Sequence, residues 1–119
     1  MWTYNATTGR LDHNGSIIAT AYSGRGEGLN NPHLESDVGV GPIPGGHYKI
    51  GPWEEFHPHL GPCVAHLTPE GHDAHGRSGF FVHGDNTKGD HSASHGCIIA
   101  GRPARDAMKA SGDTELMVV

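Results

Sequence analysis

The chain has 119 residues, enough for one domain over residues 1–119 and too few for two of ordinary size. Its 19 glycines and 8 prolines, with only 34% hydrophobic and 7% aromatic residues, predict many turns and few long helices. A formal net charge of −5 without any cluster of lysine or arginine argues against a nucleic-acid partner, because phosphates need a basic surface.

The sequence also shows no segment that would direct it into or across a membrane. No run approaches the ~18 apolar residues of a spanning helix. The first twenty residues lack the basic and continuous apolar regions of a signal peptide. We therefore expect a soluble chain that does not insert into membranes and is not exported by the ordinary signal route.

Short strands are predicted at the start of the chain. Trp2–Asn5 alternates as a half-buried strand would, and Asn14-Gly15 is a strong signal for the turn of a hairpin between Arg10–His13 and Ser16–Tyr22. These segments predict a meander of three strands. Residues 23–37 follow as a Gly-rich polar loop without a period of 2 or 3.6, and a loop of that length in a small domain favours a functional role.

The rest of the chain predicts further short strands and one helix. Arg102 to Ala110 is made of helix formers, with Pro103 suited to the first turn and Gly112 able to end the helix. The strands are expected at 47–50, 63–67 and 114–119, and long loops at 52–62 and 71–78. Seven or eight strands with one short helix predict a mainly β fold, either a small β-sandwich or a partly open barrel.

Residues Phe80 to Ala100 carry the clearest chemical signal. One apolar run ends at His83, and a Ser94-His95-Gly96-Cys97 turn presents a cysteine just before a second apolar run. A thiol with its free pKa of ~8.5 is a weak nucleophile that an adjacent imidazole activates. The backbone N–H groups of Gly96 and Cys97 are candidates to stabilise an oxyanion. This pattern predicts acyl transfer through a thioester on Cys97, with His83 as the base.

Other interpretations of these residues remain open. His95 is closer to Cys97 in sequence, but its side chain need not point at the sulfur, so we assign His95 to the pocket. In a purely structural interpretation His83 ends a strand and Cys97 is a core thiol. Cys63 lies in an apolar segment, and we expect two free thiols, although a disulfide between Cys63 and Cys97 is the alternative.

The chain has 11 histidines, some at spacings from which a zinc site could be assembled. No His-Glu-x-x-His helix is present, and the neighbouring Pro58 and Gly76 lie in loops that would place ligands imprecisely. We therefore expect no metal and no cofactor, and a zinc-dependent peptidase stays as the alternative. The histidines considered are His57, His59, His66, His72 and His75.

Phe-Val-His-Gly followed by Ser-His-Gly-Cys-Ile resembles the catalytic motif of the L,D-transpeptidase (YkuD-like) cysteine enzymes, which act on the peptide stems of bacterial peptidoglycan. Trp-Thr-Tyr-Asn-Ala-Thr-Thr-Gly, Tyr-Ser-Gly-Arg-Gly-Glu-Gly-Leu-Asn-Asn-Pro and Val-Gly-Pro-Ile-Pro-Gly-Gly-His-Tyr are similar to the family's toxic effectors, which type VI secretion delivers. The resemblance spans essentially the whole chain. It implies the catalytic fold of the L,D-transpeptidases.

The resemblance implies specific roles. Cys97 would attack the amide after the third residue of a tetrapeptide stem, and the carbonyl of Gly84 would orient the His83 base. Water would then complete an L,D-carboxypeptidase reaction, and a D-amino acid would complete an exchange. The resemblance further implies an antibacterial toxin delivered without a signal peptide to the periplasm of a target bacterium, and a cognate immunity protein.

The sequence departs from the housekeeping enzymes of that family at two points. The loop between His83 and Ser94 is shorter, and Ile99 stands where those enzymes usually carry Asn or Arg. Both changes argue against the cross-linking of neighbouring stems more than against hydrolysis. Candidate substrate contacts are Asn31, Arg102 and Asp85, and Ser94 is assigned to the pocket with His95 and Gly96. A wall-binding module that has lost its chemistry is a third possibility, against which the intact His83 and Cys97 argue.

Overall fold

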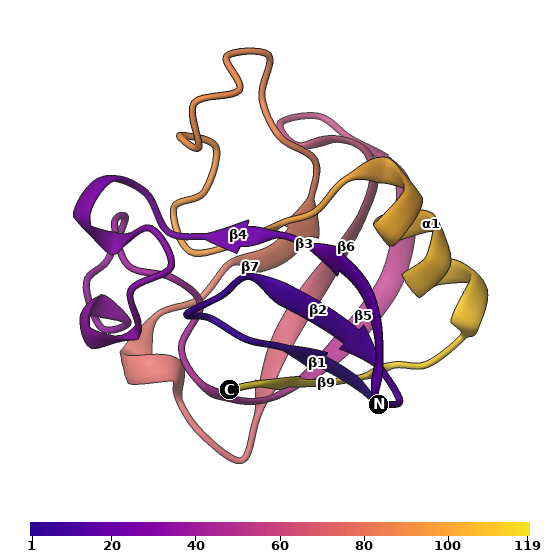
Figure 1. Cartoon of the computed structure of the whole chain (residues 1–119), viewed down its shortest axis with the longest axis horizontal. Coiled ribbons are helices and arrows are strands. Elements are labelled where there is room, and N and C mark those ends of the chain that lie inside the picture. Colours follow the sequence, from indigo (N-terminus) through magenta and orange to yellow (C-terminus); the bar gives the residue numbers. More distant parts are fainter.

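The computed structural model describes all residues, 1–119, as a mainly β molecule with one α-helix (Figure 1). Three short 3₁₀ turns, at Gly26–Gly28, Pro32–Leu34 and Ala74–Gly76, lie in the loops. No helix of the structure has the length and hydrophobicity needed to cross a membrane. The elements are β1 (Trp2–Tyr4), β2 (Arg10–His13), β3 (Ser16–Thr20), β4 (Tyr22–Ser23), β5 (Gly46–His57), β6 (Gly61–Glu70), β7 (Phe80–His83), β8 (Ile98–Ile99), α1 (Arg102–Ser111) and β9 (Glu115–Val118).

All nine strands belong to one sheet, in the order β3-β2-β1-β9-β5-β6-β7-β8-β4. The two end strands, β3 and β4, are separated in the chain by Ala21 alone. Because a single residue spans less than ~4 Å, the two ends of the sheet must come together, and the sheet curls into a nearly closed barrel. The predicted mainly β fold is confirmed, with the barrel rather than the sandwich as its form.

The interior of the barrel holds the hydrophobic core. Alternate residues of the strands point inward, which explains why Trp2 and Tyr4 of β1 are almost fully buried while Thr3 between them is not. Leu11, Tyr48 and Leu116 are likewise buried, and they come from β2, β5 and β9. The core therefore joins strands from both ends of the sequence.

Two tyrosines in this core differ in one respect. Tyr4 and Tyr48 are both fully buried, but the Tyr48 hydroxyl donates a 2.8 Å hydrogen bond to the Pro44 carbonyl, whereas the Tyr4 hydroxyl has no partner. A buried hydroxyl without a partner loses its hydration without compensation. Tyr4→Phe is therefore expected to raise the free energy of unfolding by about 1 kcal/mol, and Tyr48→Phe to lower it by about the same amount.

Urea denaturation of the two variants beside the parent protein measures both effects. The pair is a matched control, because each substitution removes one buried oxygen and leaves the ring in place. Equal losses in Tyr4→Phe and Tyr48→Phe would contradict this account of the Tyr4 hydroxyl.

The predicted loop at 52–62 is wrong. β5 and β6 form a long hairpin that continues to a His57↔Gly61 pair, so only three residues turn between the strands. Pro52 lies within a register shift between Ile50 and Trp53, where a missing N–H breaks no regular ladder. Pro62 is tolerated because β7 pairs only with Ala65–Leu67, which leaves that end of β6 without a neighbour on its other side.

The other local predictions need smaller changes. The strand expected over Ser16–Tyr22 is divided into β3 and β4, and the loop at 23–37 contains two 3₁₀ turns. Helix α1 ends at Ser111, and Gly112 takes the left-handed conformation expected of it, with φ 66°. The strand predicted at 114–119 is β9.

Candidate active site

The parallel pairing of β7 with β8 brings the predicted nucleophile and base to one face of the sheet. Val82 pairs with Ile98 and His83 with Ile99, so Cys97, one residue before β8, lies across from Phe81. Paired residues of neighbouring strands share a face, and so do residues two apart on one strand. Cys97 and His83 therefore lie on the same face of adjacent strands, two residues apart along the sheet.

Cys97 is a free, half-buried thiol at the edge of a cavity. Its Sγ accepts a 3.3 Å hydrogen bond from the Phe81 N–H and lies 3.7 Å from the Gly79 carbonyl oxygen. Burial raises the pKa of the Cys97 thiol, while the Phe81 N–H and the charge of Arg77 lower it. The cavity has a volume of about 370 Å³ and is lined by Val38–Gly39, Gly76–Phe80 and His95–Cys97.

Cys63 lies elsewhere, buried beside α1, with its Sγ 3.7 Å from an oxygen of Asp106. Both cysteines are free. The alternative in which Cys63 is bonded to Cys97 is therefore wrong for this structure, and the thiol of Cys97 is accessible from the cavity.

His83 is buried, with 5% of its surface exposed, and its orientation is fixed by its own backbone neighbour. Nδ1 lies 2.8 Å from the carbonyl oxygen of Gly84, and since a carbonyl only accepts, Nδ1 carries the proton. Nε2 is then left with a free lone pair. Burial lowers the pKa of His83, the charges of Arg105 and His57 lower it further, and the Gly84 carbonyl opposes them.

The two side chains are not joined by a hydrogen bond. The polar contacts of the Cys97 sulfur are with Phe81 and Gly79, and His83 does not line the cavity. Rotation of the sulfur away from the Gly79 carbonyl is needed before its proton can pass to the imidazole. Catalytic hydrogen bonds often tighten only when substrate is bound.

Ser94 holds the turn that presents the cysteine. Its Oγ accepts hydrogen bonds from the N–H groups of Gly24 (2.9 Å) and Gly96 (3.2 Å) and donates one to the Cys97 carbonyl (2.6 Å). The expectation that both Gly96 and Cys97 would offer an N–H to an oxyanion is corrected, because the Gly96 N–H is already bonded. The Cys97 N–H has no hydrogen-bond partner and remains available.

His95 is exposed and lines the cavity, in agreement with its assignment to the pocket. The candidate contact Asn31 serves its own loop, because its side chain accepts from the His33 N–H (3.2 Å) and donates to the Glu27 carbonyl (3.1 Å). Asn31 does not line the cavity that contains Cys97.

Asp85 and Arg102 line a different cavity, of about 470 Å³, which does not include Cys97. Asp85 accepts a 2.8 Å hydrogen bond from the Tyr22 hydroxyl, and Arg102 pairs with Asp106 at 3.0 Å. Asn31, Asp85 and Arg102, the three predicted substrate contacts, are thus not brought together around the Cys97 sulfur.

The five histidines considered for zinc do not form a group of three or more possible metal ligands. His57 and His59 are neighbours, with 5.9 Å between their ring centroids. His57 and His66 flank the ring of Phe81, at 5.4 and 4.9 Å between ring centroids. His72 contacts the His47 carbonyl, and His75 pairs with Glu35. His57 at the tip of the β5–β6 hairpin and His66 in the middle of β6 therefore place imidazole rings beside Phe81, on the face that carries His83 and Cys97.

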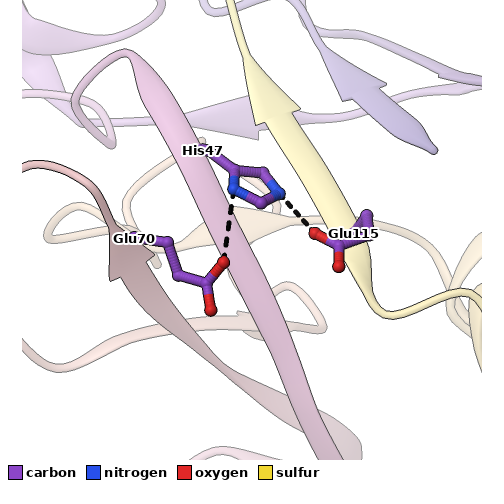
Figure 2. A group of neighbouring side chains, drawn as sticks. All are labelled: His47, Glu70 and Glu115. Atoms are coloured by element: carbon purple, nitrogen blue, oxygen red, sulfur yellow. Dashed lines mark hydrogen bonds and ion pairs between the residues drawn. The ribbon is translucent and has the colours of Figure 1, made fainter.

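A different histidine does gather with carboxylates. His47, Glu70 and Glu115 meet on β5, β6 and β9 (Figure 2). The imidazole lies between the two carboxylates, with Nδ1 3.3 Å from Glu70 and Nε2 bonded to Glu115, and Lys49 also pairs with Glu115. Because opposite ring nitrogens face the two carboxylates, the imidazole links β5, β6 and β9 through its side-chain contacts.

Sequence reasoning missed two buried arginines near the site. Arg77 and Arg105 have 8% and 6% of their surface exposed, and each is held by backbone carbonyls. A Cβ on Gly84 would lie 2.7 Å from Nη2 of Arg105, so that arginine packs directly against the turn after His83. Isolated arginines in loops or on a polar helix carry no motif, so the sequence offered no signal for them.

The nearly closed β sheet with one helix has the L,D-transpeptidase fold. A solved structure of the Ldtfm-avibactam carbamoyl enzyme superimposes with a TM-score of 0.62 at 12% identity, covering 99% of this chain and 47% of that one. Mycobacterium tuberculosis L,D-transpeptidase 1 does so with a TM-score of 0.55 at 17% identity, covering 99% and 60%. The chain thus spans about half to three fifths of the length of these structures.

Residues 17–119 match the family profile of the Tlde1 domain, so the chain belongs to the Tlde1 domain family. The predicted resemblance to the type VI effectors of the L,D-transpeptidase family is confirmed. A comparison with curated proteins found no match.

Proposed function

We propose that this protein is a peptidoglycan-targeting cysteine enzyme that removes or exchanges the terminal D-alanine of tetrapeptide stems. The fold and the family support an enzyme that acts on peptidoglycan. The observation that carries the proposal is the β7–β8 register, which puts the Cys97 thiol, at the edge of a cavity, and the His83 imidazole on one face of the sheet.

The first half-reaction forms a thioester. His83, with Nδ1 held by Gly84, takes the Cys97 proton on Nε2. The sulfur then attacks the carbonyl carbon of the third stem residue, in the amide that joins this residue to D-alanine. The free N–H of Cys97 donates to the resulting oxyanion. The carbon–nitrogen bond then breaks, His83 returns the proton to the leaving amine, and D-alanine departs.

The second half-reaction decides the product. Water attacking the thioester releases a tripeptide stem and restores the thiol, which is an L,D-carboxypeptidase reaction. A D-amino acid attacking through its amine gives a stem with a new end. Both outcomes use His83 again as the base, and neither uses a cofactor.

The family further supports a role as an antibacterial effector. In this proposal a dedicated secretion system delivers the protein, and it acts in the periplasm of a target bacterium. Loss or exchange of stem ends would weaken that cell wall, and a cognate immunity protein would protect the producing cell.

Incubation with a disaccharide tetrapeptide, followed by measurement of D-alanine, tests the proposed reaction. Release that resists EDTA and stops on treatment with iodoacetamide is expected, in the parent and in a Cys63→Ser variant. Release that EDTA abolishes would favour the zinc peptidase instead, and binding to the wall without any release would favour a non-catalytic module.

A further inference from the structure

Arg77 is a buried cation without a carboxylate partner. Its guanidinium donates to four backbone carbonyls, those of Glu35 (2.5 Å), Pro42 (2.9 Å), Gly41 (3.1 Å) and His95 (3.1 Å). It forms no ion pair, because the nearby Glu35 carboxylate is bonded to His75. Carbonyls orient a guanidinium without cancelling its charge, so Arg77 keeps a full positive charge inside the protein.

That charge lies directly under the turn that presents the nucleophile. A Cβ built on Gly96 would lie 2.4 Å from Nη2 of Arg77, so the chain passes the guanidinium with no room for a side chain. Gly96 also has φ 133°, which other residues rarely adopt. The same guanidinium packs over the Phe80 ring at 5.5 Å and lines the cavity with Cys97.

We propose that Arg77 is a positioning residue that holds the His95–Cys97 turn and, through its fixed charge beside Sγ, favours the thiolate of Cys97. The inference rests on the proposed function only in taking Cys97 as the nucleophile. The four carbonyl bonds explain why an arginine is present, since the planar guanidinium satisfies several acceptors at once.

The electrostatic surroundings of the sulfur agree with this role. Arg77 is the one charged side chain that lowers the pKa of Cys97, against the effect of burial. The other titratable side chains on this face are His95 on the same turn, His83 on β7, and His57 and His66 beside Phe81. Glu35, Asp37 and Tyr48 lie near Arg77 itself. Without Arg77, burial would act on the thiol opposed only by the Phe81 N–H.

Arg105 provides a matched control. It is equally buried and donates to the carbonyls of Ala100, Pro62 and Cys63, but it lies beside His83 and Cys63 rather than beside Cys97. Removal of its charge should disturb the protein as much as removal of Arg77, and it reaches the Cys97 thiol only through His83, in the direction opposite to that expected for Arg77.

The pH dependence of Cys97 alkylation by iodoacetamide, followed by mass spectrometry in a Cys63→Ser background, tests the inference. Arg77→Gln is expected to raise the midpoint of that profile by up to about one unit, because loss of the charge removes one of the two groups that lower the pKa of Cys97. Arg77→Lys, which keeps the charge, is expected to hold the midpoint near that of the parent. Arg105→Gln is expected not to raise it, because loss of the Arg105 charge makes His83 easier to protonate, which favours a thiolate beside it.

An unchanged midpoint in Arg77→Gln would overturn the inference, and so would an equal rise in Arg77→Gln and Arg77→Lys, because a purely structural role affects both. Circular dichroism establishes that each variant is folded. If Arg77→Gln does not fold, Arg77→Lys alone tests the inference. A midpoint that rises in Arg77→Lys, which retains the charge, would contradict the proposed effect of that charge on the thiol.

Alkylation of Cys97 requires no reaction with peptidoglycan, so the role of Arg77 and the proposed function can be refuted independently. A shifted midpoint in a protein that releases no D-alanine would leave the role of Arg77 standing and refute the proposed function. An unshifted midpoint in a protein that does release D-alanine would refute the role of Arg77 alone.

Discussion

Replacement of Cys97 by alanine is expected to lower D-alanine release from tetrapeptide stems by on the order of 10³-fold or more, because no other group can form the thioester. The substitution should leave the fold intact. Cys97 is half-buried at the edge of a cavity, and its sulfur makes only two weak polar contacts. Steady-state release with the purified variant measures the effect.

Cys63→Ala is the matched control, because Cys63 is a buried thiol beside α1, remote from the cavity. It is expected to lose some stability and keep its activity. Near-parent activity in Cys97→Ala, or loss of activity in Cys63→Ala at a temperature where it is folded, would show that the nucleophile has been misassigned.

His83→Gln is expected to lower kcat/KM by about 10²- to 10⁴-fold, the range that general base catalysis contributes. Glutamine retains an N–H that can donate to the Gly84 carbonyl, so the turn after β7 should persist without a base. His95→Gln, at an exposed position on the cavity, is the control and should change the rate far less. The opposite ranking of these two variants would assign the base to His95.

The pH profile of the parent enzyme should carry the signature of a buried imidazole. Burial, with the charges of Arg105 and His57, lowers the pKa of His83, so the neutral form that accepts a proton persists below the ordinary value of ~6.5. The rate should therefore rise with pH below ~6.5, the ordinary pKa of histidine, and should not have the midpoint of the rise at that value. Because thiol and imidazole titrate as a coupled pair, the observed values belong to the pair. A rise only above ~7 would contradict a neutral His83.

Local sequence patterns were enough to predict most strands, the helix, and the placement of His83 and Cys97 near the ends of buried strands. Asn14-Gly15, Pro103 and Gly112 fix turns and helix ends by their own backbone preferences, so no distant contact was needed to predict them. His83 and Cys97 were found because each ends or precedes an apolar run, and apolar runs become buried strands whose neighbours share a face.

Features that depend on distant contacts were not predictable. The segment at 52–62 was predicted as a loop because its prolines and exposed residues interrupt the alternation of apolar and polar residues that is typical of a strand. Only its pairing with β6 makes it a strand. Arg77 is defined by carbonyls from residues 35, 41, 42 and 95, which no local pattern connects. Asp85 and Arg102 are close to the motif in sequence, yet the fold directs them to another cavity.

The most direct test of the account is the identity of the covalent intermediate. Enzyme mixed with disaccharide tetrapeptide is quenched in acid and analysed by mass spectrometry after proteolysis. We expect a stem lacking its terminal D-alanine to be attached to the peptide that contains Cys97, and to be absent in Cys97→Ala. An adduct on any other residue, or D-alanine release that survives complete alkylation of Cys97, would contradict the central claim.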